Sequence, residues 1–265
     1  MIDLHMHTSR CRHAVGSVAD YVQAARAAGI STICFTDHLP LPGGYPDCYA
    51  MGADELPAYI ADVHEAAALS RASGGPEVLC GVEADWVPES PPLIAAATAS
   101  LGLDVVLGSV HFVEGWAFDD PEEVGGYQDL DIDGLWARYF EQVCKAVASG
   151  LFDVLAHPDL VKKFGYFPEA DPTDLYEETA KTLAAHGVAV EVNTAGLRKP
   201  VGEIYPALPF LNACRRQGVP ATMGSDAHAP GEVGAGLTSA RELLLAAGYD
   251  SVLVFRSRVS QEVAL

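Results

Sequence analysis

The sequence predicts an α/β fold, in which one barrel of parallel strands is surrounded by helices. Short β-branched runs alternate with alanine-rich stretches of helical spacing along the whole chain, and this alternation indicates βαβ units with a parallel sheet. The length of 265 residues is normal for one α/β barrel. We find no linker-like segment and no internal repeat, and therefore expect one domain spanning residues 1–265.

The strand-like runs number seven, which favours a closed barrel over an open sheet. The expected strands are Ile2–His5, Ile30–Phe35, Glu77–Val82, Asp104–Val110, Asp153–Ala156, Val188–Val192 and Val219–Met223. A further helix and a short strand are expected around Ala240–Phe255.

Six alanine-rich stretches between the strands have helical spacing. They are Val18–Ala28, Glu55–Ala72, Pro92–Ser100, Gly134–Ser149, Thr173–Ala185 and Ile204–Gln217. A glycine stands just after four of them, at Gly29, Gly150, Gly187 and Gly218, where a helix C-cap is expected. The longest irregular stretches, Leu39–Ala53 and Phe112–Leu130, each follow a predicted strand, so we expect them to form walls or lids of an active site.

The composition limits the class of function. The formal net charge of -20 disfavours a polynucleotide substrate, because nucleic-acid affinity depends on cationic side chains that neutralise phosphates. No apolar run reaches the roughly 18 residues of a membrane span. The N-terminus lacks a basic and an apolar leader segment, which predicts a cytoplasmic protein with free thiols. The sequence does not determine the oligomeric state.

Histidines gather at the ends of the predicted strands. Seven of the nine histidines lie there, and the carboxyl ends of barrel strands converge on one mouth. With two carboxylates in equivalent places, the candidate ligands are His5, His7, His13, His38, Glu83, His111, His157, Asp226 and His228. Without metal, so many histidines would leave buried nitrogens unpaired. The pattern therefore predicts a metal centre.

The ligand types and their number indicate which ions bind. Alternate residues of a strand point the same way, so His5 and His7 can hold one ion together. Imidazole and carboxylate ligands in one site favour Zn, Fe or Mn. Nine ligands exceed the roughly four that one ion takes from a protein, so we expect two or three divalent transition metals.

Several short motifs carry a family resemblance. His-x-His-Thr, Thr-Asp-His, Gly-Val-Glu, Ser-Val-His, Ala-His-Pro and Ser-Asp-Ala-His occur in this order along nearly the whole chain. The series resembles that of the PHP (polymerase and histidinol phosphatase) superfamily. Within it, Cys11-x-His13, Ser109–Phe112, His157–Phe164 and Glu191–Pro200 resemble the histidinol-phosphate phosphatases.

The resemblance implies a distorted (β/α)7 barrel with three metals at the C-terminal strand ends. It implies three ligand groups: His5, His7, Glu83 and Asp226; Glu83, His111 and His157, with Glu83 bridging; and His13, His38 and His228. Many PHP proteins have an acidic residue where this chain has His13, and the histidinol phosphatases share the histidine. The resemblance therefore favours hydrolysis of L-histidinol phosphate.

A phosphoester hydrolase with such a centre needs a nucleophile and a phosphate clamp. A hydroxide bridging two metals is the natural nucleophile, which makes Glu83 and Asp226 catalytic candidates. Arg198 is the first candidate for the clamp, because a guanidinium binds phosphate oxygens bidentately. The other candidate substrate contacts are Lys162, Lys163, Asn193 and Asp159.

Two alternatives stay open at this point. The same chemistry could act on another small phosphate ester or a nucleotide, or the chain could be a metal-binding PHP module without catalysis. A non-phosphate amidohydrolase is less favoured, because His111 stands where a catalytic lysine ligand would follow the fourth strand. In the favoured reading the partner is a small phosphorylated substrate.

Overall fold

Seven parallel strands form the centre of the computed structural model, which describes all 265 residues. In sheet order they are β1 (Ile2–Asp3), β2 (Thr32–Phe35), β3 (Glu77–Asp85), β4 (Val105–Ser109), β7 (Val154–Leu155), β8 (Ala189–Asn193) and β9 (Ala221–Gly224). The backbone N–H of Leu4 donates to Met223 O at 3.1 Å, and Met6 bridges to Ala227. These contacts join the two outer strands, so the predicted closed α/β barrel is confirmed.

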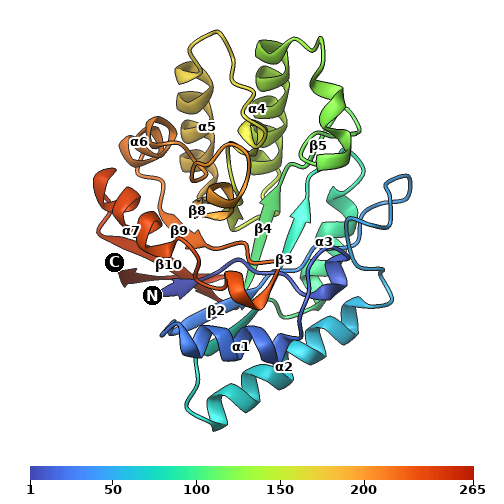
Figure 1. Cartoon of the computed structure of the whole chain (residues 1–265), viewed down its shortest axis with the longest axis vertical. Coiled ribbons are helices and arrows are strands. Elements are labelled where there is room, and N and C mark those ends of the chain that lie inside the picture. The colour runs from blue at the N-terminus through green and yellow to red at the C-terminus, as the bar shows by residue number, and fades with distance from the viewer.

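Helices surround this barrel (Figure 1). They are α1 (Val18–Ala27), α2 (Leu56–Ala72), α3 (Pro91–Ser100), α4 (Ile132–Ala148), α5 (Thr173–His186), α6 (Leu208–Arg216) and α7 (Leu237–Ala246). Nearly all residues of the seven strands are buried, as expected for parallel strands covered on both faces. No helix combines the length and apolar character that a membrane crossing requires.

Local signals in the sequence account for the helix ends. Ser17 and Asp20 form a capping box at the start of α1, in which each side chain accepts a hydrogen bond from the other residue's backbone N–H. Gly187 ends α5 in the left-handed conformation with φ 67°, which only glycine adopts without a steric cost.

The N-terminal end of the barrel is closed by an antiparallel hairpin of β10 (Ser251–Arg256) and β11 (Val259–Ala264). Arg256 at the end of β10 contacts Glu77 at the start of β3, and Arg258 in the turn contacts Asp153 just before β7. The chain therefore returns to the base of the barrel at its C-terminus, and the marks of the two termini fall close together in the view of Figure 1. The second strand of this hairpin was not predicted.

The predicted helix Ile204–Gln217 is wrong in its first turn. Tyr205 pairs with Asn193 at the end of β8, and α6 begins only at Leu208. The physical reason is that Tyr205 uses its N–H and C=O to extend the end of β8, through two hydrogen bonds with Asn193. The side chain of Asp159 then accepts from the N–H of Ala207 at 2.8 Å.

Two further boundaries differ from the prediction. Strand β3 continues to Asp85, two residues beyond Glu83, because it keeps pairing with β4. The stretch Phe112–Leu130 contains a short hairpin of β5 (Phe112–Val113) and β6 (Trp116–Ala117), followed by the 3-10 helix η2 (Pro121–Tyr127). This segment lies at the mouth of the barrel together with Leu39–Ala53, since both contribute residues to one cavity there.

Candidate metal centre

A cavity of about 610 Å³ lies at the C-terminal end of the barrel strands. The predicted ligands that line it are His7, His13, His38, Glu83, His111, His157, Asp226 and His228. His5 is fully buried and does not line the cavity. The fold therefore brings residues separated by more than 200 positions into one cluster, as the positions at the strand ends predicted.

Glu83 lies at the centre of this cluster. Its Oε2 is 3.1 Å from His5 Nε2 and 3.3 Å from His7 Nε2. Its Oε1 is 2.9 Å from His157 Nε2 and 3.6 Å from His111 Nε2. His38 Nδ1 also lies 3.6 Å from Oε2. The two carboxylate oxygens thus face different sets of imidazoles, which is the geometry that a bridging ligand between two ions requires.

Asp226 completes the group around His5 and His7. Its Oδ1 lies 3.3 Å from His7 Nε2, 3.7 Å from His5 Nε2 and 3.4 Å from His228 Nδ1. The backbone of Asp226 has φ 53° and that of His157 has φ 25°, a region that costs energy for residues other than glycine. Such strain at two candidate ligands is typical of functional sites.

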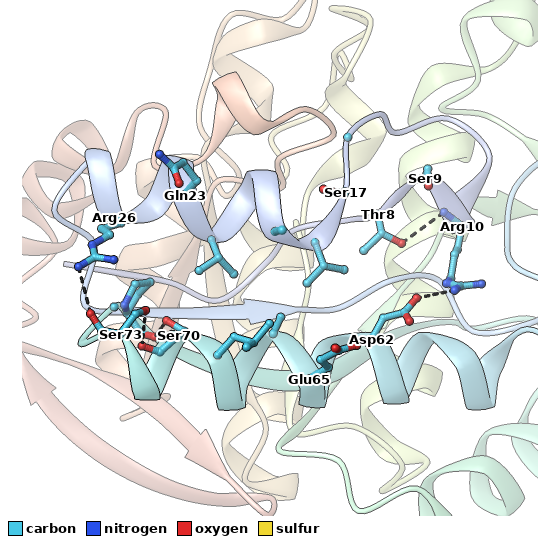
Figure 2. A pocket seen from close by; sticks show the side chains of 18 of the residues that line it. Thr8, Ser9, Arg10, Ser17, Gln23, Arg26, Asp62, Glu65, Ser70 and Ser73 are labelled. Atoms are coloured by element: carbon cyan, nitrogen blue, oxygen red, sulfur yellow. Dashed lines mark hydrogen bonds and ion pairs between the residues drawn. The ribbon is translucent and has the colours of Figure 1, made fainter.

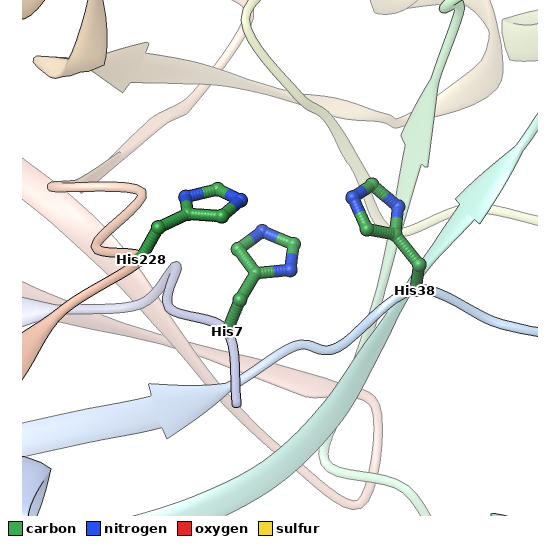
Figure 3. Close-up of side chains that lie close together, drawn as sticks. All are labelled: His7, His38 and His228. Atoms are coloured by element: carbon green, nitrogen blue, oxygen red, sulfur yellow. The ribbon is translucent and has the colours of Figure 1, made fainter. Parts of the chain in front are cut away.

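The remaining histidines extend the cluster outward. The rings of His7 and His228 stack at 4.3 Å between centroids, and that of His38 lies 4.6 Å from His7 (Figure 3). His13 stacks on His228 at 4.8 Å and is the most exposed of these side chains. Ligand atoms of His7, His38 and His228 lie within 4.8 Å of one another. His7 therefore contacts the proposed third group as well as the first.

The donor atoms of this cluster fit metal ions. His38 Nδ1 and Asp226 Oδ1 are buried and have no hydrogen-bond partner, whereas buried polar atoms are normally paired. The atoms around Glu83 are imidazole nitrogens and carboxylate oxygens 2.9–3.7 Å apart, a spacing that a shared cation about 2 Å from each would produce. The detailed assignment to three groups stays a prediction.

Charge interactions keep the two central carboxylates ionised. Burial would raise the pKa of Glu83, but His38 and His5 nearby hold it well below its usual range. Burial has the same effect on Asp226, where His5 and His7 hold the pKa well below the usual value. Ionised carboxylates are the form that binds a metal cation.

Sequence reasoning missed the residue that orients His5. Glu191 is buried in β8 and accepts three hydrogen bonds: from His5 Nδ1 at 2.7 Å, from the backbone N–H of His157 at 2.8 Å and from Asn193 Nδ2 at 3.0 Å. The bond to Nδ1 leaves Nε2 of His5 facing Glu83. Such a carboxylate behind a ligating histidine orients its ring and raises its basicity. The signal was the alternation Glu191-x-Asn193, which places both side chains on one face of β8.

Asp85 was missed for a similar reason. It lies two residues after Glu83 in β3 and contacts His111 Nδ1 and, at 3.5 Å, His38 Nδ1. The predicted strand Glu77–Val82 ends before Asp85, so this carboxylate had no predicted place in the site.

The structure separates the predicted substrate contacts into two groups. Lys163 lines the cavity, and Asn193 lies beside it, donating to Asp226 Oδ2 at 3.3 Å. Lys162 is buried elsewhere, where its Nζ contacts Asp159 Oδ2 at 3.0 Å and donates to Ile204 O at 3.0 Å. Neither Lys162 nor Asp159 lines the cavity. Their charges pair with each other, so the two side chains belong to the protein interior next to the cavity.

Arg198 lies behind the segment that carries Asp226. Its Nη2 donates to the carbonyl oxygens of Ser225 at 2.8 Å and Asp226 at 3.2 Å, and its Nε lies 3.3 Å from Glu232. Lys199 and Arg12 line the cavity instead. The role of Arg198 as a phosphate contact stays a prediction.

A second cavity, of about 690 Å³, lies between α1 and α2 (Figure 2). Two of its arginines are bound within the chain, since Arg10 donates to Asp62 at 2.5 Å and Arg26 to Ser73 O at 3.1 Å. It contains none of the predicted metal ligands.

A parallel α/β barrel with histidines and carboxylates gathered at its C-terminal mouth defines the class of metal-dependent barrel hydrolases. Comparison with known proteins makes this more specific. The model of the PHP domain matches residues 3–195, and that of the PHP-associated region matches residues 211–243. The chain belongs to the PHP domain family.

Two relatives and one solved structure are similar to this chain over most of its length. A protein of Deinococcus radiodurans named probable histidinol-phosphatase is 43% identical over 235 residues, which cover 88% of each chain. The histidinol-phosphatase of Bacillus subtilis is 28% identical over 88% of this chain and 95% of its own. The solved structure of histidinol phosphate phosphatase from Lactococcus lactis, complexed with zinc, L-histidinol and phosphate, has a TM-score of 0.84 at 22% identity and 98% coverage of both chains.

Proposed function

We propose that this protein is a metal-dependent phosphomonoester hydrolase that converts L-histidinol phosphate to L-histidinol and phosphate. The observation that carries the proposal is the position of Glu83, with one oxygen facing His5 and His7 and the other facing His111 and His157. Two ions held by one carboxylate are a recurring arrangement in phosphoester hydrolysis. The relatives from D. radiodurans and B. subtilis support the choice of substrate.

The ligand groups predicted from the family resemblance remain part of this proposal. The first comprises His5, His7, Glu83 and Asp226, the second Glu83, His111 and His157, and the third His13, His38 and His228. Zinc in the L. lactis structure favours zinc, while iron and manganese suit the same ligands. Two or three bound ions would supply Lewis acidity and an activated water at neutral pH.

The residues of the chain contribute binding and orientation. Lys163 and Lys199 line the cavity and provide ammonium groups that attract a phosphate dianion. Bound divalent cations would add the positive charge that opposes the formal net charge of -20, which otherwise repels phosphate. Glu191 and Asn193 keep His5 and Asp226 in place, through bonds of 2.7 and 3.3 Å. A preorganised site of this kind loses no free energy to rearrangement during the reaction.

The test combines metal analysis with a panel of substrates. The purified protein is analysed for Zn, Fe and Mn per chain, and phosphate release is measured for L-histidinol phosphate, nucleotides and other small phosphomonoesters. We expect two or three ions per chain and the highest kcat/KM for L-histidinol phosphate. Hydrolysis of another ester with a higher kcat/KM would change the substrate, and metal binding without phosphate release would leave a non-catalytic module. The cytoplasmic location predicted from the sequence is part of the same proposal.

A further inference from the structure

One ion pair in the cavity is not used by the metal cluster. The Nζ of Lys163, just after β7, donates to Asp119 Oδ2 at 2.9 Å. Asp119 follows the hairpin β5–β6, so two segments far apart in sequence meet here. Both side chains line the cavity, and their exposed fractions are 11% and 20%. The pair therefore presents one positive and one negative charge side by side, mostly shielded from water, next to the candidate metal ligands.

The neighbours of this pair are already committed to other contacts. Asp120 accepts from the hydroxyl of Tyr49 at 2.5 Å and from the N–H of Glu122 at 2.8 Å, so it joins the two loops of the mouth. Lys162, the adjacent lysine, is held by Asp159 and Ile204 O beneath the cavity. By contrast, the only hydrogen bond of the Lys163 ammonium is the one to Asp119. Lys163 and Asp119 can therefore give up their mutual ion pair for contacts with a ligand, while the other contacts of the cavity wall stay in place.

We propose that the Lys163–Asp119 pair makes the enzyme selective for phosphate esters that carry an ammonium group close to the phosphate. In this inference, which rests on the proposed function, Lys163 turns to a phosphate oxygen while Asp119 receives the ammonium group. One ion pair is replaced by two that match the charges of the substrate. L-Histidinol phosphate is such an ester, because its amino group is on the carbon next to the one that carries the phosphate.

The same exchange discriminates against esters without the amine. When such an ester draws Lys163 to its phosphate, Asp119 stays behind as a mostly buried carboxylate without a partner. Leaving one partner of a buried ion pair uncompensated is costly, and a site built around a charged group rejects an analogue that lacks it. The pair therefore acts as an attraction for one ester class and a penalty for the other.

The experiment measures kcat/KM for two matched esters: L-histidinol phosphate and its analogue in which hydrogen replaces the amino group. We expect the wild type to prefer the aminated ester by about 10- to 100-fold, the range for a charged hydrogen bond. Asp119→Asn is expected to reduce this preference at least tenfold, whereas Asp119→Glu, which keeps the charge, retains most of it. Glu123→Gln is the matched control, because Glu123 is an exposed carboxylate in the same segment outside the cavity lining, and it should leave the preference unchanged.

A second variant keeps the inference testable if Asp119→Asn does not fold. Lys163→Met is expected to weaken both esters while the preference for the amine persists, because Asp119 remains. Metal content and the thermal unfolding midpoint are recorded for every variant. An Asp119→Asn protein with normal metal content and an unchanged preference would overturn the inference but leave the proposed function intact. If the wild type releases phosphate from neither ester, the proposed function fails and this inference with it.

Discussion

The two ends of the barrel use charged residues in opposite ways. At the N-terminal end, Arg256 donates to both oxygens of Glu77 at 2.6 and 2.7 Å, and Arg258 contacts both oxygens of Asp153 at 2.9 to 3.1 Å. Each of these four charges has a partner of opposite sign. At the C-terminal mouth, by contrast, buried imidazole nitrogens and carboxylate oxygens remain without hydrogen-bond partners.

This difference indicates that the N-terminal end of the barrel serves stability and that the C-terminal mouth serves function. Polar groups that are fully paired hold the strand starts together and need nothing further. Buried polar groups without partners persist only where the surrounding structure forces them, which is typical of sites that bind a ligand. The barrel therefore isolates its unsatisfied groups at the mouth, as α/β barrels generally do.

The largest effect is expected for Glu83→Ala, at the mouth. Removing the carboxylate that faces five imidazoles should abolish phosphatase activity, with a loss of about 10³-fold or more in kcat/KM, because several kcal/mol of charge stabilisation disappear. Metal analysis should show fewer ions per chain while circular dichroism stays that of the wild type. Full activity in this variant would rule out Glu83 as the bridging ligand.

Glu191→Gln tests the layer behind the ligands. A glutamine has one acceptor oxygen and cannot replace both carboxylate oxygens that receive His5 Nδ1 and the His157 N–H. We expect a 10- to 100-fold loss of metal affinity, measured by competition with a chelator. Glu178→Gln, an exposed carboxylate on α5, is the control. Wild-type metal affinity in Glu191→Gln would show that His5 needs no such support.

Arg198→Ala distinguishes a phosphate contact from a structural role. If its guanidinium also reaches the substrate, KM for L-histidinol phosphate should rise about tenfold with little change in metal content, as for loss of a charged hydrogen bond. The alternative follows from its bonds to the carbonyl oxygens of Ser225 and Asp226: reduced metal content with an unchanged KM would mean that Arg198 only positions Asp226.

The smallest effect is expected at the other end, for Arg258→Ala. This ion pair is partly exposed, with 34% of the arginine side chain accessible, so its loss should cost about 1 kcal/mol of unfolding free energy. Thermal unfolding should then shift down by about 2–4 °C, with kcat/KM and metal content equal to those of the wild type. A loss of activity without a change in the midpoint would contradict the separation between the two ends.

Much of the fold and of the metal cluster could be predicted because each rests on local signals. Glycine C-caps and alternating strands and helices located the elements, and closure of the barrel brought the predicted ligands around Glu83. The errors arose where a longer-range contact overrides local preference, as in the pairing of Tyr205 with Asn193. The extra strand β11 was missed because its residues are all exposed, so it lacks the apolar pattern that marks a buried strand.

A PHP-type α/β barrel with a histidine-rich metal centre could be predicted from residue types and their places at strand ends, because these are local properties. The groups behind the ligands and the cations that face the cavity are defined only in the folded chain. Glu191 reaches His5 across 186 positions, and Lys163 rather than Lys162 faces Asp119. These contacts depend on the direction of each side chain after the strands pair, which spacing along the chain does not specify.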